Sequence, residues 1–251
     1  MTRPARRVVS LVPSLTEAFA SVDPEALVGA TDWCTHPADL DAHGVTRVRG
    51  TKNPDLRAVA ALEPDVVVVT KEENREIDVR RMREAGLRVE VTDVETVPGA
   101  VETFEDLFDR VLGWPRPDWL AAARDLWCGP LPEVTRTVLV PIWRDPWMAV
   151  GASTFTSDLC RRLGWRNVLD DATKPDGSPD RYPALDPAPP DGLDGLSADV
   201  VLLPDEPYVF TADDGPEAFP RTPVELVSGR LLTWYGPSLV DAHHSVARTG
   251  G

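Results

Sequence analysis

The chain has 251 residues, 42% of them hydrophobic, which is enough to bury the core of one large domain or of two small lobes. Its 41 acidic and 26 basic side chains give a formal net charge of −15. Such a surface repels phosphate backbones and anionic lipid head groups, so nucleic acid and membrane surfaces are excluded as expected partners.

The first half of the chain alternates between the sequence patterns of strands and helices. Strands are expected at residues 8–12, 27–30, 66–70 and 87–91, and helices at residues 14–21, 55–62 and 76–85. The β-branched run at residues 66–70 suits a strand that is covered on both faces. Strands that alternate with helices in this way predict a mostly parallel sheet.

A helical stretch at residues 99–112 follows, and prolines separate it from a second helix at residues 118–127. The pattern then starts again, with strands at residues 137–142, 199–203, 224–227 and 230–232, and a helix at residues 155–163. A proline-rich loop is expected at residues 175–190, and His243 and His244 are expected in a polar tail. These elements predict an N-terminal α/β lobe (1–98), a connecting helical segment (99–134) and a C-terminal α/β lobe (135–251). The sequence shows no internal repeat.

The start of the chain and its cysteines predict a cytoplasmic protein. Residues 1–7 are basic, but polar residues soon interrupt the apolar run that a secretion signal needs. Cys34, Cys128 and Cys160 lie far apart, and an odd number of cysteines cannot form a closed set of disulfides. Free thiols favour a reducing compartment. No stretch approaches the roughly 20 apolar residues of a membrane-spanning helix.

No enzyme signature is present: the sequence lacks G-x-S-x-G, a Walker loop, G-x-G-x-x-G and H-E-x-x-H. Cys34 and His36 share one loop, but two ligands fall short of a closed metal site. The mixed charges at residues 71–75 are more typical of a helix cap with surface ion pairs than of acid–base catalysis. The protein is therefore predicted not to be an enzyme, with no catalytic and no metal-ligating residues.

Ligands of parallel α/β sheets bind beyond the carboxyl ends of the strands, and the loops expected there are rich in aromatic and hydrogen-bonding side chains. Flat aromatic faces with few polar groups suit a large, partly apolar ligand, although these tryptophans could instead pack in the interior. The candidate ligand-binding residues are Ser14, Trp33, His36, Lys52, Asn53, Glu73, Trp143, Arg144, Trp147, Glu206, Tyr208, Trp234 and Tyr235.

Several segments resemble a known family. Residues 7–17 (RVVSLVPSLTE) resemble the start of the cobalamin- and iron-siderophore-binding proteins of bacterial ABC importers, and residues 62–67 (LEPDVV) resemble their second recurrent motif. A subgroup described as helical-backbone metal receptors, which are like class III periplasmic binding proteins, resembles the chain over further segments. These are residues 33–37 (WCTHP), 50–54 (GTKNP), 71–75 (KEENR), 144–148 (RDPWM), 181–183 (RYP), 203–208 (LPDEPY) and 233–236 (TWYG).

The resemblance implies an α/β protein of two lobes with mostly parallel sheets, joined by a helical backbone segment and holding a ligand in the cleft between the lobes. It implies a metal-bearing macrocycle or chelate as ligand, and a corrinoid such as cobalamin is expected. The tryptophan rings would pack against the ligand, while Lys52, Arg144 and Tyr235 would contact its polar edges or carboxylates. The alternatives are an ABC-importer subunit for haem or ferric siderophore, and an enzyme that modifies such a ligand through Cys34, His36 and Glu73.

Two departures from the family argue against docking to an ABC transporter. The bridging helix of the family is unbroken, whereas Pro115, Pro117 and Pro130 interrupt the corresponding segment here, and proline inside a helix costs about 3 kcal/mol. The family docks through a glutamate on a first-lobe helix, and Arg57 occupies the matching position. Docking to a transporter is therefore not expected.

Overall fold

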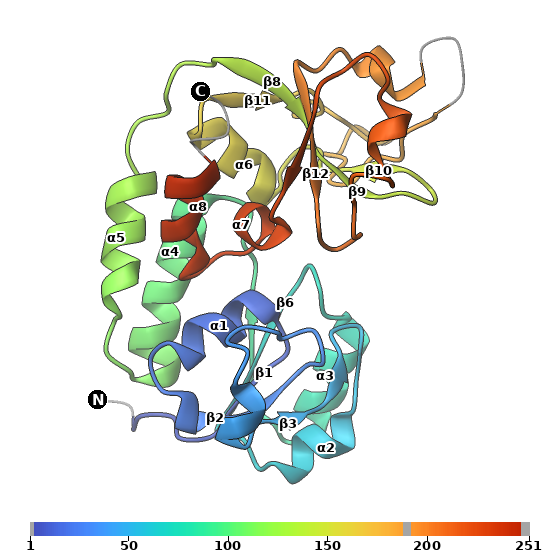
Figure 1. Ribbon diagram of the computed structural model, residues 1–251. Helices are drawn as coiled ribbons and strands as arrows, with labels where there is room; N and C mark the ends of the chain where they lie inside the picture. Colours follow the sequence, from blue (N-terminus) through green and yellow to red (C-terminus); the bar gives the residue numbers. More distant parts are fainter. Residues whose placement is uncertain (1–2, 188–191, 247–251) are drawn as a thin grey trace. The chain divides into compact units, whose positions relative to one another are not determined.

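The computed structural model describes residues 3–187 and 192–246, which form two compact units (Figure 1). Unit 1 comprises Met1–Val94, Pro98–Arg124 and Tyr235–Pro237. Unit 2 comprises Glu95–Val97, Asp125–Trp234 and the chain from Ser238 onward. The segment expected to connect two lobes, 99–134, is thus shared between the units.

Unit 1 is built on a five-stranded, wholly parallel sheet in the order β3-β2-β1-β6-β7. Its strands are β1 (Val8–Ser10), β2 (Leu27–Ala30), β3 (Thr46–Arg47), β6 (Val66–Thr70) and β7 (Val89–Thr92). Every residue of β6 is buried, as the β-branched run predicts. Val67 and Val69 point into a core with Val59 of α2 (Leu56–Ala61) and Met82 of α3 (Glu76–Glu84). A strand covered on both faces therefore needs its continuous apolar run.

The other helices of unit 1 pack through aromatic side chains. Helix α1 (Pro13–Ala20) follows β1 directly, and α4 (Val97–Asp106) continues into a π-helical turn at Leu107–Leu112. Phe19 of α1 meets Phe108 edge to face, with ring centroids 6.4 Å apart. Gly113 adopts a left-handed conformation (φ 67°) that ends this helical stretch, and α5 (Asp118–Trp127) begins after the two prolines. The helical segment is therefore two helices, as its prolines predict.

Unit 2 contains a four-stranded parallel sheet in the order β11-β8-β12-β13. The strands are β8 (Arg136–Leu139), β11 (Trp165–Asn167), β12 (Val200–Pro204) and β13 (Val224–Val227), and a small antiparallel pair joins β9 (Pro141–Trp143) to β10 (Met148–Ala149). Helices α6 (Phe155–Arg162), α7 (Gly229–Thr233) and α8 (Ser238–Val246) complete the unit. The core gathers Leu139, Val201 and Leu203 from the sheet with Trp147 and Phe210 from the loops.

The predicted α/β fold with two lobes of parallel sheets is confirmed, but three local predictions are wrong. The strand expected at residues 137–142 is divided between β8 and β9. Residues 230–232 belong to helix α7, because Asp205 Oδ1 accepts the Gly229 N–H at 2.6 Å and anchors the start of that helix. His243 and His244 lie in α8 instead of a tail, and the His243 ring packs on Trp127 with centroids 5.1 Å apart.

The loop expected at residues 175–190 contains no helix or strand over its described part, and residues 188–190 lie outside the described residues. Within residues 3–187 and 192–246, no helix is both long and apolar enough to cross a lipid bilayer.

Candidate functional site

In unit 1, one buried side chain holds three loops together at the carboxyl edge of the sheet. The Asn74 carboxamide donates to Leu11 O (3.3 Å) and to Thr51 O (2.9 Å), and its oxygen accepts the Thr70 N–H (2.9 Å). Leu11 follows β1, and Thr51 lies in the turn between β4 (Arg49–Gly50) and β5 (Asn53–Pro54). Thr70 is the last residue of β6. Asn74 is only 7% exposed, so it positions these loops from below.

Tyr235 reaches the same edge from the far end of the sequence. Its buried hydroxyl forms hydrogen bonds with the side chains of Ser14 and Thr70. Burial raises the pKa of Tyr235 well above its ordinary value, and the nearby charge of Glu73 adds to this effect. Three candidate residues, Ser14, Glu73 and Tyr235, are thus brought together in unit 1.

The candidate residues that follow β2 and β4 lie on the surface. Trp33 is 66% exposed, and its indole nitrogen lies close to Gly50. A Cβ atom at Gly50 would stand 3.2 Å from that nitrogen and would overlap the Asn53 carboxamide oxygen, so a larger residue here would displace the Trp33 and Asn53 side chains. Lys52 and His36 are also exposed, and His36 Nδ1 lies 3.1 Å from Thr35 Oγ1.

Cys34 is not placed for nucleophilic or metal chemistry. Its side chain is fully buried, and Sγ lies 3.0 Å from Thr16 Oγ1 and 3.1 Å from Thr31 Oγ1. Burial raises the pKa of the Cys34 thiol, although both hydroxyls oppose the shift, so the reactive thiolate is disfavoured. In the described parts of the chain, no three His, Cys, Asp or Glu side chains are arranged to hold a metal ion. Nothing here supports an enzyme that acts through Cys34, His36 and Glu73.

In unit 2, Arg144 lies in the turn between β9 and β10 and is held by two carboxylates. Its Nη1 pairs with Asp214 Oδ1, and its Nη2 lies 2.5 Å from Glu217 Oε1. Tyr208 donates its hydroxyl to the second oxygen of Asp214 at 2.6 Å. We name these four residues the Arg144 cluster. Neither carboxylate was predicted from the sequence, because Asp214 lies 70 positions after Arg144.

The tryptophans of unit 2 divide into exposed and buried ones. Trp143 is 43% exposed and meets the Tyr208 ring edge to face, with centroids 5.7 Å apart. Trp147 is only 7% exposed because it stacks on Phe210 (5.7 Å) within the core. Trp234 is buried as well. Trp143 can therefore offer a face to a ligand, whereas Trp147 supports the loop that carries Arg144.

Glu206 has a packing role at the carboxyl end of β12. A Cβ atom at Gly229 would stand 2.7 Å from Glu206 O and 2.9 Å from Glu206 N, so the Glu206 backbone lies directly against α7. The close approach is possible only because residue 229 is glycine.

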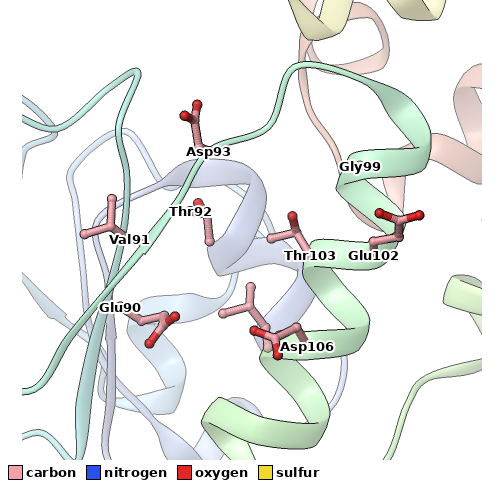
Figure 2. A pocket seen from close by; sticks show the side chains of 9 residues that line it. Glu90, Val91, Thr92, Asp93, Gly99, Glu102, Thr103 and Asp106 are labelled. Atoms are coloured by element: carbon pink, nitrogen blue, oxygen red, sulfur yellow. The ribbon is translucent and has the colours of Figure 1, made fainter.

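A cavity of about 400 Å³ lies elsewhere in unit 1, between β7 and α4 (Figure 2). Acidic residues line it on both sides, Glu90 and Asp93 on the strand side and Glu102 and Asp106 on the helix. Arg110 pairs with Glu90 and Asp106 at 2.7 Å each. None of the candidate residues lines this cavity.

No family model matches the chain. The vitamin B12-binding proteins of Salmonella typhi and Salmonella typhimurium are each 25% identical to it over 185 residues, which is 68% of this chain. The match spans 65% of those proteins, slightly less than two thirds of their length.

Solved structures share the fold over almost the whole chain. The periplasmic vitamin B12 binding protein of Vibrio cholerae has 16% identity and a TM-score of 0.73, with 98% of this chain and 96% of that chain covered. A periplasmic haem-binding protein from Pseudomonas aeruginosa has 21% identity and a TM-score of 0.72, with 98% and 92% covered. An ABC transporter substrate-binding protein from Listeria monocytogenes has 17% identity and a TM-score of 0.68, with 98% of each chain covered. All these names describe binding proteins, in agreement with the predicted absence of enzymatic activity.

The predicted cytoplasmic location is wrong, because the similar proteins of Vibrio cholerae and Pseudomonas aeruginosa are periplasmic. Cys34 and Cys160 are buried and shielded from oxidants, so these two free thiols do not require a reducing compartment.

Proposed function

Because the chain is a distant member of the class III periplasmic-binding-protein family and a remote homologue of the vitamin B12-binding proteins, we propose that it is a substrate-binding protein for a corrinoid such as cobalamin. The ligand would contact the loops at the carboxyl ends of the parallel strands. Haem and ferric siderophores are the alternative ligands.

The observation that carries the proposal is an exposed tryptophan a few residues beyond a parallel strand in each unit, β2 in unit 1 and β8 in unit 2. Trp33 follows β2 in unit 1, and Trp143 ends β9 in unit 2. A large aromatic side chain that stays in water forfeits the gain of burial, and such residues commonly mark binding surfaces. Flat indole faces suit the flat, largely apolar ring of a tetrapyrrole-derived macrocycle.

The tyrosines favour a corrinoid over haem. A phenol that ligates haem iron must lose its proton. The hydrogen bond to Asp214 is the main cause that raises the pKa of Tyr208, and burial is the main cause that raises the pKa of Tyr235. Both phenols are therefore less ready than a free tyrosine to become the phenolate that ligates haem iron, and both hydroxyls already bond to groups of the protein.

Association with an ABC transporter is typical of this family, and the similar Listeria protein is named as such a subunit. Arg57 lies exposed on α2 at the position matched to a docking glutamate. We propose that a cognate transporter, if it uses this helix, presents acidic instead of basic side chains to it.

The test is isothermal titration calorimetry of the purified protein with cyanocobalamin, hemin and a ferric siderophore. We expect saturable binding of cyanocobalamin. Trp33→Ala and Trp143→Ala should each weaken it about tenfold, as expected for loss of an aromatic contact of about 1–2 kcal/mol.

The matched control is Leu131→Ala, which removes another half-exposed apolar side chain from the segment that precedes β8 and should leave the affinity unchanged. Tight binding of hemin or the siderophore without binding of cyanocobalamin would replace the corrinoid by that ligand. No saturable binding of any of the three would overturn the proposed function.

A further inference from the structure

The Arg144 cluster is organised to keep its cation occupied before any ligand arrives. The guanidinium faces two carboxylates, so the three charged groups carry a net charge of −1. Arg144 is 26% exposed on its side chain, which leaves it within reach of a ligand. An arginine in a ligand-facing loop would ordinarily attract carboxylates through its paired N–H groups, and here both sides of the fork are already used.

The two carboxylates are themselves fixed by other contacts. Asp214 accepts the Tyr208 hydroxyl, and Glu217 Oε2 accepts the Gly215 N–H at 2.7 Å. The Arg144 guanidinium also lies over the Trp147 ring, 5.5 Å from its centroid. Each partner is therefore held by at least two contacts, unlike an isolated surface ion pair whose side chains move freely.

Arg144 and Glu217 stabilise each other in their charged forms. Burial lowers the pKa of Arg144, but the hydrogen bond to Glu217 and the charges of both carboxylates outweigh it, and the pKa lies above its ordinary value. Burial raises the pKa of Glu217. Hydrogen bonds from the Gly215 N–H and from Arg144 lower it by more, so the net shift is downward. Glu217 therefore stays charged and remains in place as a competitor for the guanidinium.

We propose that Asp214 and Glu217 are specificity-determining residues that mask Arg144, so that ligands with free carboxylates are rejected and amide-bearing corrinoids are accepted. The inference rests on the proposed function in one respect, because it takes the β9–β10 turn to face the ligand. A haem propionate that approaches Arg144 must displace a resident carboxylate or stand beside it, and either choice is unfavourable. A neutral amide can accept or donate hydrogen bonds beside the Arg144 cluster without displacing either carboxylate.

The test is the double variant Asp214→Asn, Glu217→Gln, titrated with hemin by its Soret absorbance. Both amides retain an oxygen for the Tyr208 hydroxyl and the Gly215 N–H, so the loop can keep its structure, and the unfolding temperature verifies this. We expect hemin to bind at least about tenfold more tightly than to the parent protein, since one charge-assisted contact to a carboxylate becomes available. The affinity for cyanocobalamin should change much less than the affinity for hemin, because cyanocobalamin carries amides instead of free carboxylates.

Three controls isolate the cause. Asp213→Asn removes a neighbouring exposed charge that has no ion pair to Arg144, and it should not improve hemin binding. Addition of Arg144→Ala to the double variant should abolish the gain. Hemin dimethyl ester, which lacks free carboxylates, should bind the parent protein and the double variant equally in the same detergent buffer.

The outcomes of the two proposals are separable. A hemin gain in the double variant that depends on Arg144 supports masking, whether or not cyanocobalamin binds; absence of cyanocobalamin binding would then overturn only the ligand proposed above. Binding of cyanocobalamin without a hemin gain, or an equal gain in Asp213→Asn, would overturn masking and leave the proposed function standing.

Discussion

The two units follow one backbone plan. Taken in chain order within each unit, the strands β1, β2, β6 and β7 lie in the order β2-β1-β6-β7, and β8, β11, β12 and β13 lie in the order β11-β8-β12-β13. In both, the first strand lies between the second and the third. The sequence shows no such repeat, because the shared feature is the pairing of strands and not the identity of side chains.

The two units also share an aspartate that precedes a central strand and accepts backbone N–H groups from the neighbouring strand segment. Asp65 precedes β6 and accepts the N–H groups of Arg6 (2.7 Å) and Arg7 (3.0 Å), while Asp199 precedes β12 and accepts the N–H of Thr137 at 2.6 Å. Two residues before each aspartate the backbone is left-handed, at Glu63 (φ 45°) and Ser197 (φ 54°). Each aspartate thus binds the start of its strand to the neighbouring strand.

The units differ at the carboxyl edges of their sheets. In unit 1 the loops are joined by neutral, buried hydrogen bonds through Asn74, whereas in unit 2 the β9–β10 turn is joined to residues 214–217 by partly exposed ion pairs. Buried hydrogen bonds are costly to break, and exposed ion pairs contribute little to stability. The same backbone plan therefore ties the loops at the carboxyl edge to stability in unit 1, whereas in unit 2 the corresponding contacts can change with little effect on stability.

The largest effect expected from this difference is that of Asn74→Ala. The change leaves Leu11 O, Thr51 O and the Thr70 N–H without their partner, and we expect a loss of about 3 kcal/mol in the free energy of unfolding. Urea denaturation followed by circular dichroism measures it. Asp214→Asn, the counterpart in unit 2, should change stability by about 0.5 kcal/mol or less.

Asn74→Asp separates the loss of hydrogen bonds from the loss of volume. Its carboxylate would face two carbonyl oxygens, which disfavours the charged form, so stability should recover in part as the pH falls from 8 to 5. A loss that does not vary with pH would contradict the role given to the two donated hydrogen bonds.

Substitution of one glycine in each unit should have an intermediate effect on stability and should also differ between the units. Gly229→Ala in unit 2 drives a Cβ against the Glu206 backbone and should cost about 2 kcal/mol of stability. Gly50→Ala in unit 1 meets the movable Asn53 carboxamide and should cost less than about 1 kcal/mol, but it displaces Asn53 and Trp33 and should weaken ligand binding. Thermal unfolding and calorimetric titration of both variants check this. Equal losses of stability would contradict the distinction.

The smallest expected effect on stability is that of replacing Asp199, the aspartate that precedes β12 in unit 2. Hydrogen bonds from the Thr137 N–H and hydroxyl lower the pKa of Asp199 below its ordinary value of 3.8. Its contribution is therefore fully present above that value and is lost as the pH falls through the lower pKa of the folded state. Asp199→Asn should lower the unfolding temperature slightly at pH 6, and the difference from the parent should shrink below pH 3.8. A constant difference down to pH 2.5 would refute this linkage.

The elements with a continuous pattern were predictable from the sequence. The valine run at residues 66–70 forms a buried strand, and Pro115 and Pro117 separate two helices. Residues 230–232 were wrongly predicted as a strand, because a short apolar run suits a strand and a helix equally. The Asp205 side chain, which is distant in the sequence, bonds to the start of the helix that they form.

The candidate site was predictable only where it follows a strand. Trp33 comes after β2 and Trp143 comes after β8, and both side chains are exposed. Asp214 and Glu217 could not be assigned, because no local pattern reveals that a turn 70 residues away returns to Arg144. The thirteen ligand-binding residues remain a prediction that the titrations above address.

The place of Tyr235 has a consequence for how the protein is made. The contiguous parts of unit 1 end at Arg124, yet Tyr235, which bonds Ser14 and Thr70 in its interior, is synthesised about 110 residues later. At roughly 5–20 residues per second, a ribosome needs on the order of 10 s to cover that interval. Unit 1, although most of it emerges first, therefore lacks this buried contact until most of unit 2 has been synthesised.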